Sequence, residues 1–566
     1  MRRTHDEPPA PAPRSNMTAR RLLLLLLLLA SGCAGLRPAA PTSLCILQTS
    51  DIHGHIAPER VAGWKSRAGG GATLAGCVRM IREENARKGI PTILIDSGDF
   101  YLGTPEGDLS KGAALIELMN AVGYDAAAVG NHDWDGGVGN LIGLAANAGF
   151  PLLGANVVDP ESGETPPFLR RWIVKDFGAL RVGVAGITLE NPTPQEMPGG
   201  KGAIVCAEPE KPLRESIAEL RREGAAVIVL ASHIGMGRDK RLAREVEGVD
   251  VILGGHDHLA VRQPYHSRAH GTLICHPGSY GRHLGRLDLE LDPATGRVAS
   301  HSYELIPLYE GRCPPDEAAA AIVEKWRAAA GARFDEVVGR AETDFPKTRA
   351  GVGAMGEMIT DAMREASGAR IAFNQRHGIR GPILKGEIRY RDVYSVLPFD
   401  DTVWTVELTG RQVRGIVEKI LSFRRPDNLR FSGLSVAYDP SAPRGERIRG
   451  VECGGKDLDP DAPYLTAVNT YGSRTIGFSW KRLGLPFGKE EQGYCIAHCQ
   501  GALSSWHRAT FASTRGTRPD DPILRYRRQL TGAPESVRCG SFQSPEPPSQ
   551  GDRHQRERTG GLPPAE

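Results

Sequence analysis

Five short apolar runs in the first half of the chain are each followed, within a few residues, by aspartate, asparagine or histidine. The runs are Leu44–Gln48, Thr92–Ile95, Ala126–Val129, Val227–Leu230 and Val251–Leu253. Between them lie stretches with apolar residues at helical spacing, such as Leu74–Lys88 and Pro212–Glu223. Alternating strands and helices predict a layered α/β domain. Because open α/β sheets bind ligands at the carboxyl ends of their strands, the polar residues after these runs are candidates for a functional site.

The chain is too long for a single hydrophobic core. It has 566 residues, and cores stop growing beyond roughly 250–300 residues. We expect one domain at 42–310 and a smaller one at 336–480. The linker between them, 311–335, contains the Ala-rich segment Pro314–Phe334, which is predicted to form one helix. The stretch 481–566 is rich in polar residues without a period and is predicted to be a disordered tail. The second domain has helix and strand signals at Val352–Ala366, Val403–Leu408 and Leu434–Tyr438.

The N-terminal segment 1–33 has the pattern of an export signal. Arginines precede eight leucines, Leu22–Leu29, and the small residues Ala30-Ser31-Gly32 lead to Cys33. Eight leucines are too few to span a bilayer, which takes about 20 apolar residues. The segment is similar to a bacterial lipoprotein signal. We therefore expect a periplasmic or surface protein with a lipid on Cys33, the alternative being a signal that is cleaved without lipidation.

Charge and cysteine content exclude some classes of function. The formal net charge is only +3, which does not indicate a basic surface for a nucleic-acid polymer. The ten cysteines include no C-x-x-C pair, so the spacing is not that of a zinc finger. Export would permit disulfides, but their pairing does not follow from the sequence.

Four sequence elements after the apolar runs carry metal-ligand residue types. Asp51 and His53 follow the first run, Asp99 the second, and Asn131 and His132 the third; the last two runs are followed by His233 and by His256 and His258. In an extended segment residues i and i+2 point to the same side, so each D-x-H or H-x-H pair can converge. Carboxylate, imidazole and amide donors suit Mn²⁺, Zn²⁺ or Fe better than Ca²⁺. Each element alone is weak, but the four together predict a site with two divalent metal ions.

This order of motifs resembles the calcineurin-like metallophosphatases, whose pattern is D-x-H, G-D, G-N-H-[DE], H and G-H-x-H. The resemblance implies a four-layer α/β/β/α domain with two metal ions. One ion would be held by Asp51, His53, Asp99 and His258, and the other by Asp99, Asn131, His233 and His256. Asp99 would bridge them. Two ions of this kind can clamp the oxygens of a phosphoester and generate hydroxide near neutral pH.

In this resemblance His132 binds no metal and is available as a general acid or as a donor to a phosphoryl oxygen. A carboxylate that is hydrogen-bonded to a histidine favours its cationic form. In the 5′-nucleotidase branch this carboxylate lies three residues further on, where the present chain has Asp135. Asp133 is the less favoured partner.

Further blocks are similar to the bacterial 5′-nucleotidase and UDP-sugar hydrolase family. Among them are Gly154-Ala155-Asn156-Val157, Pro277-Gly278-Ser279-Tyr280-Gly281, Met355-Gly356-Glu357, Leu397-Pro398-Phe399 and Phe431-Ser432-Gly433-Leu434. The family's smaller α+β C-terminal domain holds the substrate. By this resemblance Arg349 and Arg380 contact the phosphate, and Phe399 and Tyr471 stack on the base; guanidinium groups suit phosphate oxygens. The family's acidic GGDG-like turn is absent after Tyr471.

The sequence therefore predicts an extracytoplasmic phosphoesterase acting on 5′-nucleotides, UDP-sugars or 2′,3′-cyclic nucleotides. Its partners would be two divalent ions (Mn, Zn or Fe) and a small phosphoester, with no nucleic-acid polymer and with membrane contact only through the lipid. Two alternatives remain open at this point. One is a thiosulfohydrolase-like sister enzyme, and the other is a catalytically weak surface binding protein.

Overall fold

The computed structural model describes residues 43–190, 204–345, 354–375, 378–399, 403–422 and 429–469. The signal segment with Cys33, the predicted tail 481–566, Arg349 and Tyr471 lie outside these described residues. The chain forms two compact units. The first runs to Ile52 and continues with Thr73–Phe100 and Met119–Asp316; the second comprises His53–Ala72, Tyr101–Leu118 and the chain from Glu317 onward.

The first unit contains two six-stranded sheets. One has the order β14-β13-β1-β2-β3-β4, in which β1 to β4 are parallel and β13 and β14 are antiparallel additions. Its strands are Ser43–Thr49 (β1), Thr92–Asp96 (β2), Ala126–Ala128 (β3), Leu152–Leu153 (β4), His283–Leu291 (β13) and Val298–Pro307 (β14).

The second sheet has the order β11-β12-β10-β9-β7-β6, with β7, β9, β10 and β12 parallel. Its strands are Trp172–Asp176 (β6), Arg181–Thr188 (β7), Val227–His233 (β9), Val251–Gly254 (β10), Tyr265–His266 (β11) and Leu273–Cys275 (β12). The five apolar runs of the sequence are thus divided between two sheets: the first three form β1, β2 and β3, and the last two form β9 and β10.

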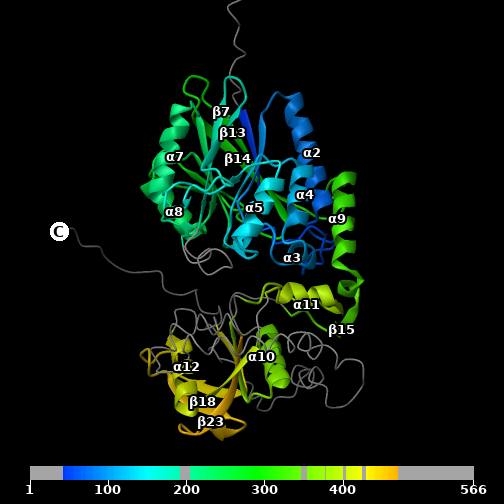
Figure 1. The fold of residues 1–566 in the computed structure, drawn as a ribbon, viewed down its shortest axis with the longest axis vertical. Helices are drawn as coiled ribbons and strands as arrows, with labels where there is room; N and C mark the ends of the chain where they lie inside the picture. Colours follow the sequence, from blue (N-terminus) through cyan, green and yellow to red (C-terminus); the bar gives the residue numbers. More distant parts are fainter. Residues whose placement is uncertain are drawn as a thin grey trace, which may run out of the picture. The chain divides into compact units, whose positions relative to one another are not determined.

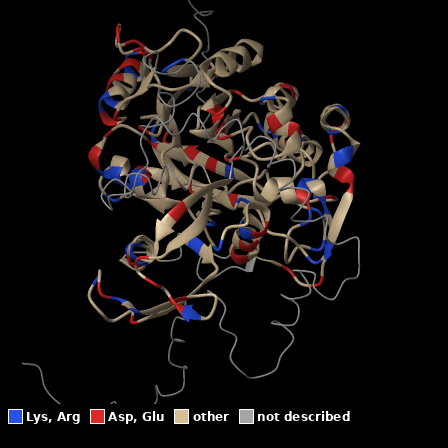
Figure 2. Cartoon of the chain, turned by 60° about the horizontal axis from the view of Figure 1, so that its bottom comes forward, with Lys and Arg blue, Asp and Glu red and all other residues tan. Residues whose placement is uncertain are grey.

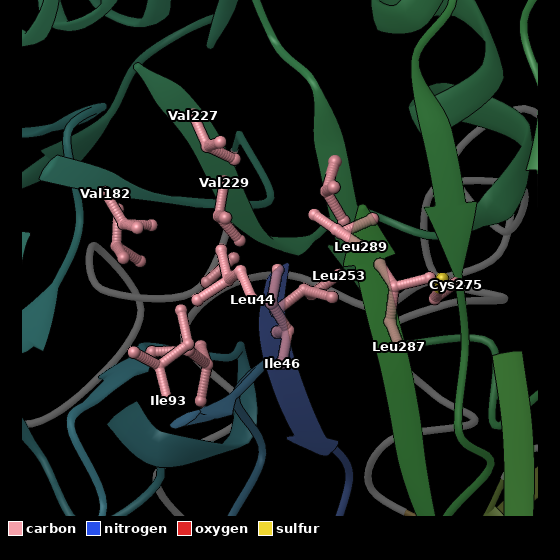
Figure 3. Packing of buried hydrophobic residues seen from close by; sticks show 14 of the residues in the cluster. Leu44, Ile46, Ile93, Val182, Val227, Val229, Leu253, Cys275, Leu287 and Leu289 are labelled. Carbon is pink, nitrogen blue, oxygen red and sulfur yellow. The ribbon is translucent and has the colours of Figure 1, made fainter. Parts of the chain in front are cut away.

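Alternate residues of both sheets meet in one core. Figure 3 shows Leu44 and Ile46 of β1 near Val229 of β9 and Leu253 of β10, all of them fully buried. The opposite faces of the strands are covered by helices (Figure 1), with α2 (Gly71–Arg87) and α5 (Val138–Asn147) on one side and α7 (Glu210–Arg222) and α8 (Met236–Glu245) on the other. The expected four-layer α/β/β/α arrangement is confirmed. It arises because strand residues of period two present one apolar face to each neighbouring layer.

The second unit is α+β, as expected. A four-stranded sheet, β18-β23-β16-β19, has α12 (Gly410–Ser422) on one face and α10 (Ala354–Ser367) on the other. Strand β16 (Ile371–Gln375) shows how alternate residues serve the two faces of this sheet. Ile371 and Phe373 pack with α12, whereas Ala372 packs with α10. The other strands of this sheet are β18 (Val403–Thr409), β19 (Leu429–Ser432) and β23 (Pro463–Asn469). Further elements that lie wholly in this unit are α3 (Pro105–Leu109), α9 (Glu317–Ala330), β15 (Val337–Ala341), β17 (Gly386–Arg389), α11 (Tyr390–Val396), β20 (Leu434–Tyr438), β21 (Ile448–Cys453) and β22 (Lys456–Asp457), and α4 (Ala113–Val122) is shared with the first unit.

The linker helix is shorter than the sequence pattern predicted. Instead of one helix over Pro314–Phe334, α9 ends at Ala330 and a separate 3₁₀ turn follows at Ala332–Asp335. The break lies at Gly331, whose φ is 100°, a conformation that no helix contains and that glycine adopts without steric cost. No helix among the described residues is both long and apolar enough to cross a bilayer.

One disulfide is present among the described residues. It joins Cys77 of α2 to Cys313, across a sequence separation of 236 residues. Four other described cysteines are buried thiols, namely Cys45, Cys206, Cys275 and Cys453. In Figure 2 acidic and basic residues are interspersed over the described helices and loops.

Candidate active site

The candidate ligands lie just beyond the carboxyl ends of neighbouring strands. In the first unit, Asp51 and Asp99 follow β1 and β2, Asn131 follows β3, His233 ends β9, and His256 and His258 follow β10. His53 belongs to the second unit by position, but it is only two residues beyond Asp51 on the same loop. Two facing sheets with the same strand direction therefore bring residues that are up to 207 positions apart to one end of the layers, as in other α/β folds.

These side chains form two groups with the residue types of metal sites. The first is Asp51, His53 and His258, and the second is Asp99, His233 and His256; within each group the donor atoms lie within 4.8 Å of one another. Asn131 adjoins the second group, since its Oδ1 is 3.0 Å from Nδ1 of His256. Asp99 is a member of the second group only, with Oδ2 at 3.0 Å from Nε2 of His233.

The backbone at these positions is unusual. Seven described non-glycine residues have positive φ, and five of them belong to the two groups: Asp51, His53, Asp99, His256 and His258. The left-handed region costs a residue with a Cβ roughly 1–3 kcal/mol, and it persists only where surrounding contacts impose it. Backbone hydrogen bonds supply such contacts here, for example from Asp51 N to Gly98 O at 2.9 Å. Concentration of this strain at one site is typical of a functional centre.

The histidine rings are oriented by backbone carbonyls. Nδ1 of His53 lies 2.7 Å from Leu102 O, and Nδ1 of His233 lies 2.7 Å from Ser97 O. Because a carbonyl oxygen can only accept, Nδ1 must carry the hydrogen in both rings. In a neutral ring this leaves the lone pair on Nε2. Metal-binding histidines are usually held by such a contact through their other nitrogen.

Burial controls the charge states of the cluster. It raises the pKa of Asp51 to about 6, with a further increase from the neighbouring Asp99 carboxylate. It lowers the pKa of His256 to about 4. For His233 burial acts in the same direction, but attraction to Asp99 outweighs it and raises the pKa to about 10. A buried carboxylate stays ionised only beside a positive charge, such as a protonated histidine or a metal cation.

The donor set fits divalent cations. Each group combines one buried carboxylate with two imidazoles, a mixture that Mn²⁺, Zn²⁺ and Fe²⁺ accept and that Ca²⁺ and Mg²⁺, which prefer oxygen, do not favour.

His132 and Asp135 form a second kind of pair next to this cluster. Nδ1 of His132 lies 2.7 Å from Oδ2 of Asp135, and the backbone N–H of His132 donates to Asp99 Oδ1 at 2.7 Å. Asp133, in contrast, is fully buried and accepts backbone hydrogen bonds from Asp99, Phe100 and Gly130. Asp133 thus joins the loops after β2 and β3, while Asp135 contacts the imidazole.

In the second unit the structure brings together two of the residues that resemble substrate contacts. Arg380 and Phe399 are both half-buried, and Cζ of Arg380 lies 5.6 Å from the centre of the Phe399 ring. The backbone of Arg380 is held by a hydrogen bond from its N–H to Val396 O at 2.8 Å. A guanidinium beside an aromatic ring suits a ligand that has both a phosphate and a base.

Sequence reasoning missed two features of this region. The left-handed backbone of the five candidate ligands was not anticipated. The one local signal is a glycine directly before two of them, Gly98 before Asp99 and Gly255 before His256. The buried pair of His276 and Asp239 was also missed: Nε2 of His276 lies 2.8 Å from Asp239 Oδ2, and Ser232 donates to Oδ1 at 2.6 Å. The spacing of these residues, on β9, α8 and after β12, contains no local signal.

Comparison with known families agrees with this architecture. The calcineurin-like phosphoesterase family matches residues 45–260, and the 5′-nucleotidase C-terminal domain matches residues 337–480. Endonuclease YhcR of Bacillus subtilis (strain 168) is 26% identical over 480 residues, which cover 79% of this chain and 38% of that protein. A 5′-nucleotidase of Vibrio vulnificus (strain CMCP6) is 26% identical over 483 residues, covering 76% of this chain and 84% of that protein.

Solved structures show the same fold. A 5′-nucleotidase precursor from Thermus thermophilus matches with a TM-score of 0.67 and 26% identity over 76% of this chain and 90% of that one. The sulfate thiohydrolase SoxB from the same organism matches with a TM-score of 0.69 and 23% identity over 83% of this chain and 94% of that one, and shows a common fold only. The chain combines the domains of the 5′-nucleotidase family, a calcineurin-like phosphoesterase domain and a 5′-nucleotidase C-terminal domain, and is a metal-dependent phosphoester hydrolase.

Proposed function

We propose that this protein hydrolyses 5′-nucleotides or related nucleotide phosphoesters such as UDP-sugars and 2′,3′-cyclic nucleotides. The observation that carries the proposal is the pair of Asp/His groups at the strand ends with the His132–Asp135 pair beside them. We place the phosphoesterase domain at 42–310 and the substrate-binding domain at 336–480, joined through 311–335.

The two groups would hold two divalent ions. We assign Asp51, His53 and His258 to one ion and Asn131, His233 and His256 to the other, with Asp99 as the bridge. Bound there, two cations supply Lewis-acid polarisation of the phosphoryl group and a water of lowered pKa. The contribution of the chain is to keep the donors in place: the carbonyls of Leu102 and Ser97 orient the rings of His53 and His233.

His132 is the residue that we expect to exchange a proton with the substrate. Asp135 accepts from Nδ1 and so stabilises the imidazolium and aligns the ring. His132 can then donate its proton to the departing oxygen or a hydrogen bond to a phosphoryl oxygen. The link from its backbone N–H to Asp99 sets its position relative to the second group.

The second unit would supply substrate contacts. Arg380 suits a phosphate oxygen, and Phe399 next to it suits the flat face of a base. Arg349 and Tyr471, outside the described residues, are assigned the matching roles of a second phosphate contact and a second stacking ring.

We also propose that the protein is exported and lipid-anchored at Cys33. The disulfide between Cys77 and Cys313 supports export, because such bonds persist in oxidising compartments. Cys33→Ser should release the protein from the membrane fraction or block its processing, whereas an equally soluble wild type would indicate a signal cleaved without lipidation.

Hydrolysis of a substrate panel by the purified protein tests the proposed activity. The panel comprises AMP, UDP-glucose, 2′,3′-cyclic AMP and a thiosulfonate ester, assayed before and after removal of metal with a chelator. The measured products are phosphate from AMP, UMP from UDP-glucose, a nucleoside monophosphate from 2′,3′-cyclic AMP and sulfate from the thiosulfonate. We expect hydrolysis of at least one nucleotide, its loss after stripping and its return with Mn²⁺ or Zn²⁺. Turnover of the thiosulfonate alone would favour the thiosulfohydrolase alternative, and turnover of no substrate by protein with two bound ions would favour the binding-protein alternative.

A further inference from the structure

The candidate ligands are not the only described non-glycine residues with a left-handed backbone. Besides the five ligands, Lys111 and Tyr280 have positive φ among the described residues, and the φ of Tyr280 is 64°. Tyrosine does not favour this region, so surrounding contacts must impose it.

Tyr280 reaches the first Asp/His group in two ways. Its backbone N–H donates to Asp51 O at 2.8 Å, which fixes the loop after β1. Its ring lies against the ring of His258 at a centroid distance of 5.2 Å and an interplanar angle of 85°. One residue therefore contacts two of the three members of this group and lies in the same unit as both.

The ring of Tyr280 is itself held in place. Cζ of Arg282 lies 4.8 Å from the ring centre, a distance at which a cation over an aromatic face is attracted. Tyr280 is half-buried, so the contact with Arg282 restricts the ring at a position where solvent would otherwise allow it to move. A perpendicular pair of rings, as between Tyr280 and His258, is the favoured arrangement of aromatic side chains.

We propose that Tyr280 is a positioning residue of the first metal group: its ring holds the imidazole of His258, and its backbone holds Asp51, in the orientation that binds the ion. This inference rests on the proposed function, because it presupposes that Asp51, His53 and His258 bind a metal. It goes beyond that proposal by assigning a role to a residue that is not a ligand. Partners of this outer kind typically change metal affinity by about 10–100-fold.

A second tyrosine of the first unit allows a matched test. Tyr265 is also half-buried and also lies under a cation, with Nζ of Lys240 at 4.4 Å from its ring centre, but within the described part of the chain its ring contacts no candidate ligand. Tyr265→Ala therefore removes a comparable ring and a comparable cation contact away from the site. Tyr280→Phe keeps the ring and removes only the hydroxyl. Tyr280→Gly removes the ring and also relieves the left-handed backbone.

The experiment is calorimetric titration of the metal-free full chain with Mn²⁺, together with thermal unfolding and kinetics on the nucleotide that wild type hydrolyses. In Tyr280→Ala we expect one of two ions to bind about 10–100-fold more weakly and kcat to fall at low Mn²⁺ and recover when Mn²⁺ is raised, with KM little changed. Tyr280→Phe and Tyr265→Ala should bind both ions as wild type does. Tyr280→Gly should also bind one ion more weakly, even if the free energy of unfolding of this variant is normal, because the ring of Tyr280 is what holds His258.

Three results would overturn the inference. They are unchanged binding of both ions in Tyr280→Ala, an equal loss in Tyr265→Ala, and a loss in Tyr280→Phe that matches the one in Tyr280→Ala. A wild-type chain that binds no pair of ions would overturn the proposed function and this inference together. Two ions in wild type and two equally tight ions in Tyr280→Ala would overturn the inference alone.

Discussion

Two of the histidine–carboxylate pairs in the first unit, His233–Asp99 and His132–Asp135, differ sharply in their surroundings. His233 and Asp99 are 3.0 Å apart with side-chain exposures of 0% and 2%, whereas His132 and Asp135 are 2.7 Å apart with exposures of 20% and 23%. In the first pair the second ring nitrogen is hydrogen-bonded to Ser97 O. A histidine and an aspartate are thus paired twice: His233 and Asp99 are buried and fixed by hydrogen bonds, whereas solvent reaches His132 and Asp135.

The difference in burial indicates different tasks. A buried ring whose two nitrogens both face protein atoms cannot exchange protons quickly with a substrate, but it can hold a metal ion in a defined place. A ring that solvent partly reaches, with a carboxylate on one nitrogen, can move a proton. We therefore expect substitutions in the first pair to remove metal and substitutions in the second pair to slow the chemistry while metal remains.

Asp99→Asn should have the largest effect. The change removes the negative charge next to His233 and, on our assignment, the bridge between the ions. We expect loss of bound metal and a fall in kcat/KM beyond about 10⁴-fold, more than a general acid normally contributes. Metal analysis and phosphate release measure both. Asp176→Asn, at an exposed ion pair with Arg181, is the control. Near-normal turnover with two metals per chain would remove Asp99 from the site.

His132→Ala should be next in size. The loss of a general acid or hydrogen-bond donor is expected to lower kcat by about 10²–10⁴-fold. The backbone N–H that contacts Asp99 is retained in this variant, so both ions should stay bound. Metal content measured alongside kcat checks this. If metal were lost together with activity, His132 would belong with the ligands and the contrast between the two pairs would fail.

Asp133→Asn and Asp135→Asn should separate two neighbouring carboxylates. An amide at 133 has one acceptor oxygen for three backbone donors, so we expect a loss of about 1–3 kcal/mol in the free energy of unfolding. The amide at 135 should change stability by less than about 0.5 kcal/mol and lower kcat less than His132→Ala does. Thermal unfolding and kcat measured on both variants show which carboxylate serves stability and which serves the reaction. Equal loss of stability would mean that Asp135 is structural as well.

The smallest effect concerns the base of the nucleotide, in the second unit. Stacking on Phe399 tolerates every base, and the acidic turn of the family is absent from the sequence. We expect kcat/KM for AMP, GMP, CMP and UMP to differ by less than roughly 100-fold, and Arg380→Ala to weaken all four similarly. A stronger preference for one base would show that another residue reads it.

Local patterns in the sequence determined much of this protein. Strands β1, β2, β3, β9 and β10 were predictable because their residues form short apolar runs, and the candidate ligands because they follow those runs directly. The D-x-H and H-x-H spacings needed only the period of an extended chain. The two-domain organisation followed from length and from the family resemblance.

Tertiary structure decided the rest, because the deciding contacts join residues far apart in the chain. The local patterns did not show which apolar runs share a sheet, and the structure places β1 to β3 in one sheet and β9 and β10 in the other. Nor did the local patterns show the pairing of Cys77 with Cys313, the contact of Tyr280 with His258, or the left-handed backbone of five ligands. Backbone strain of this kind is imposed by long-range hydrogen bonds such as that from Tyr280 N to Asp51 O, and no local propensity predicts it.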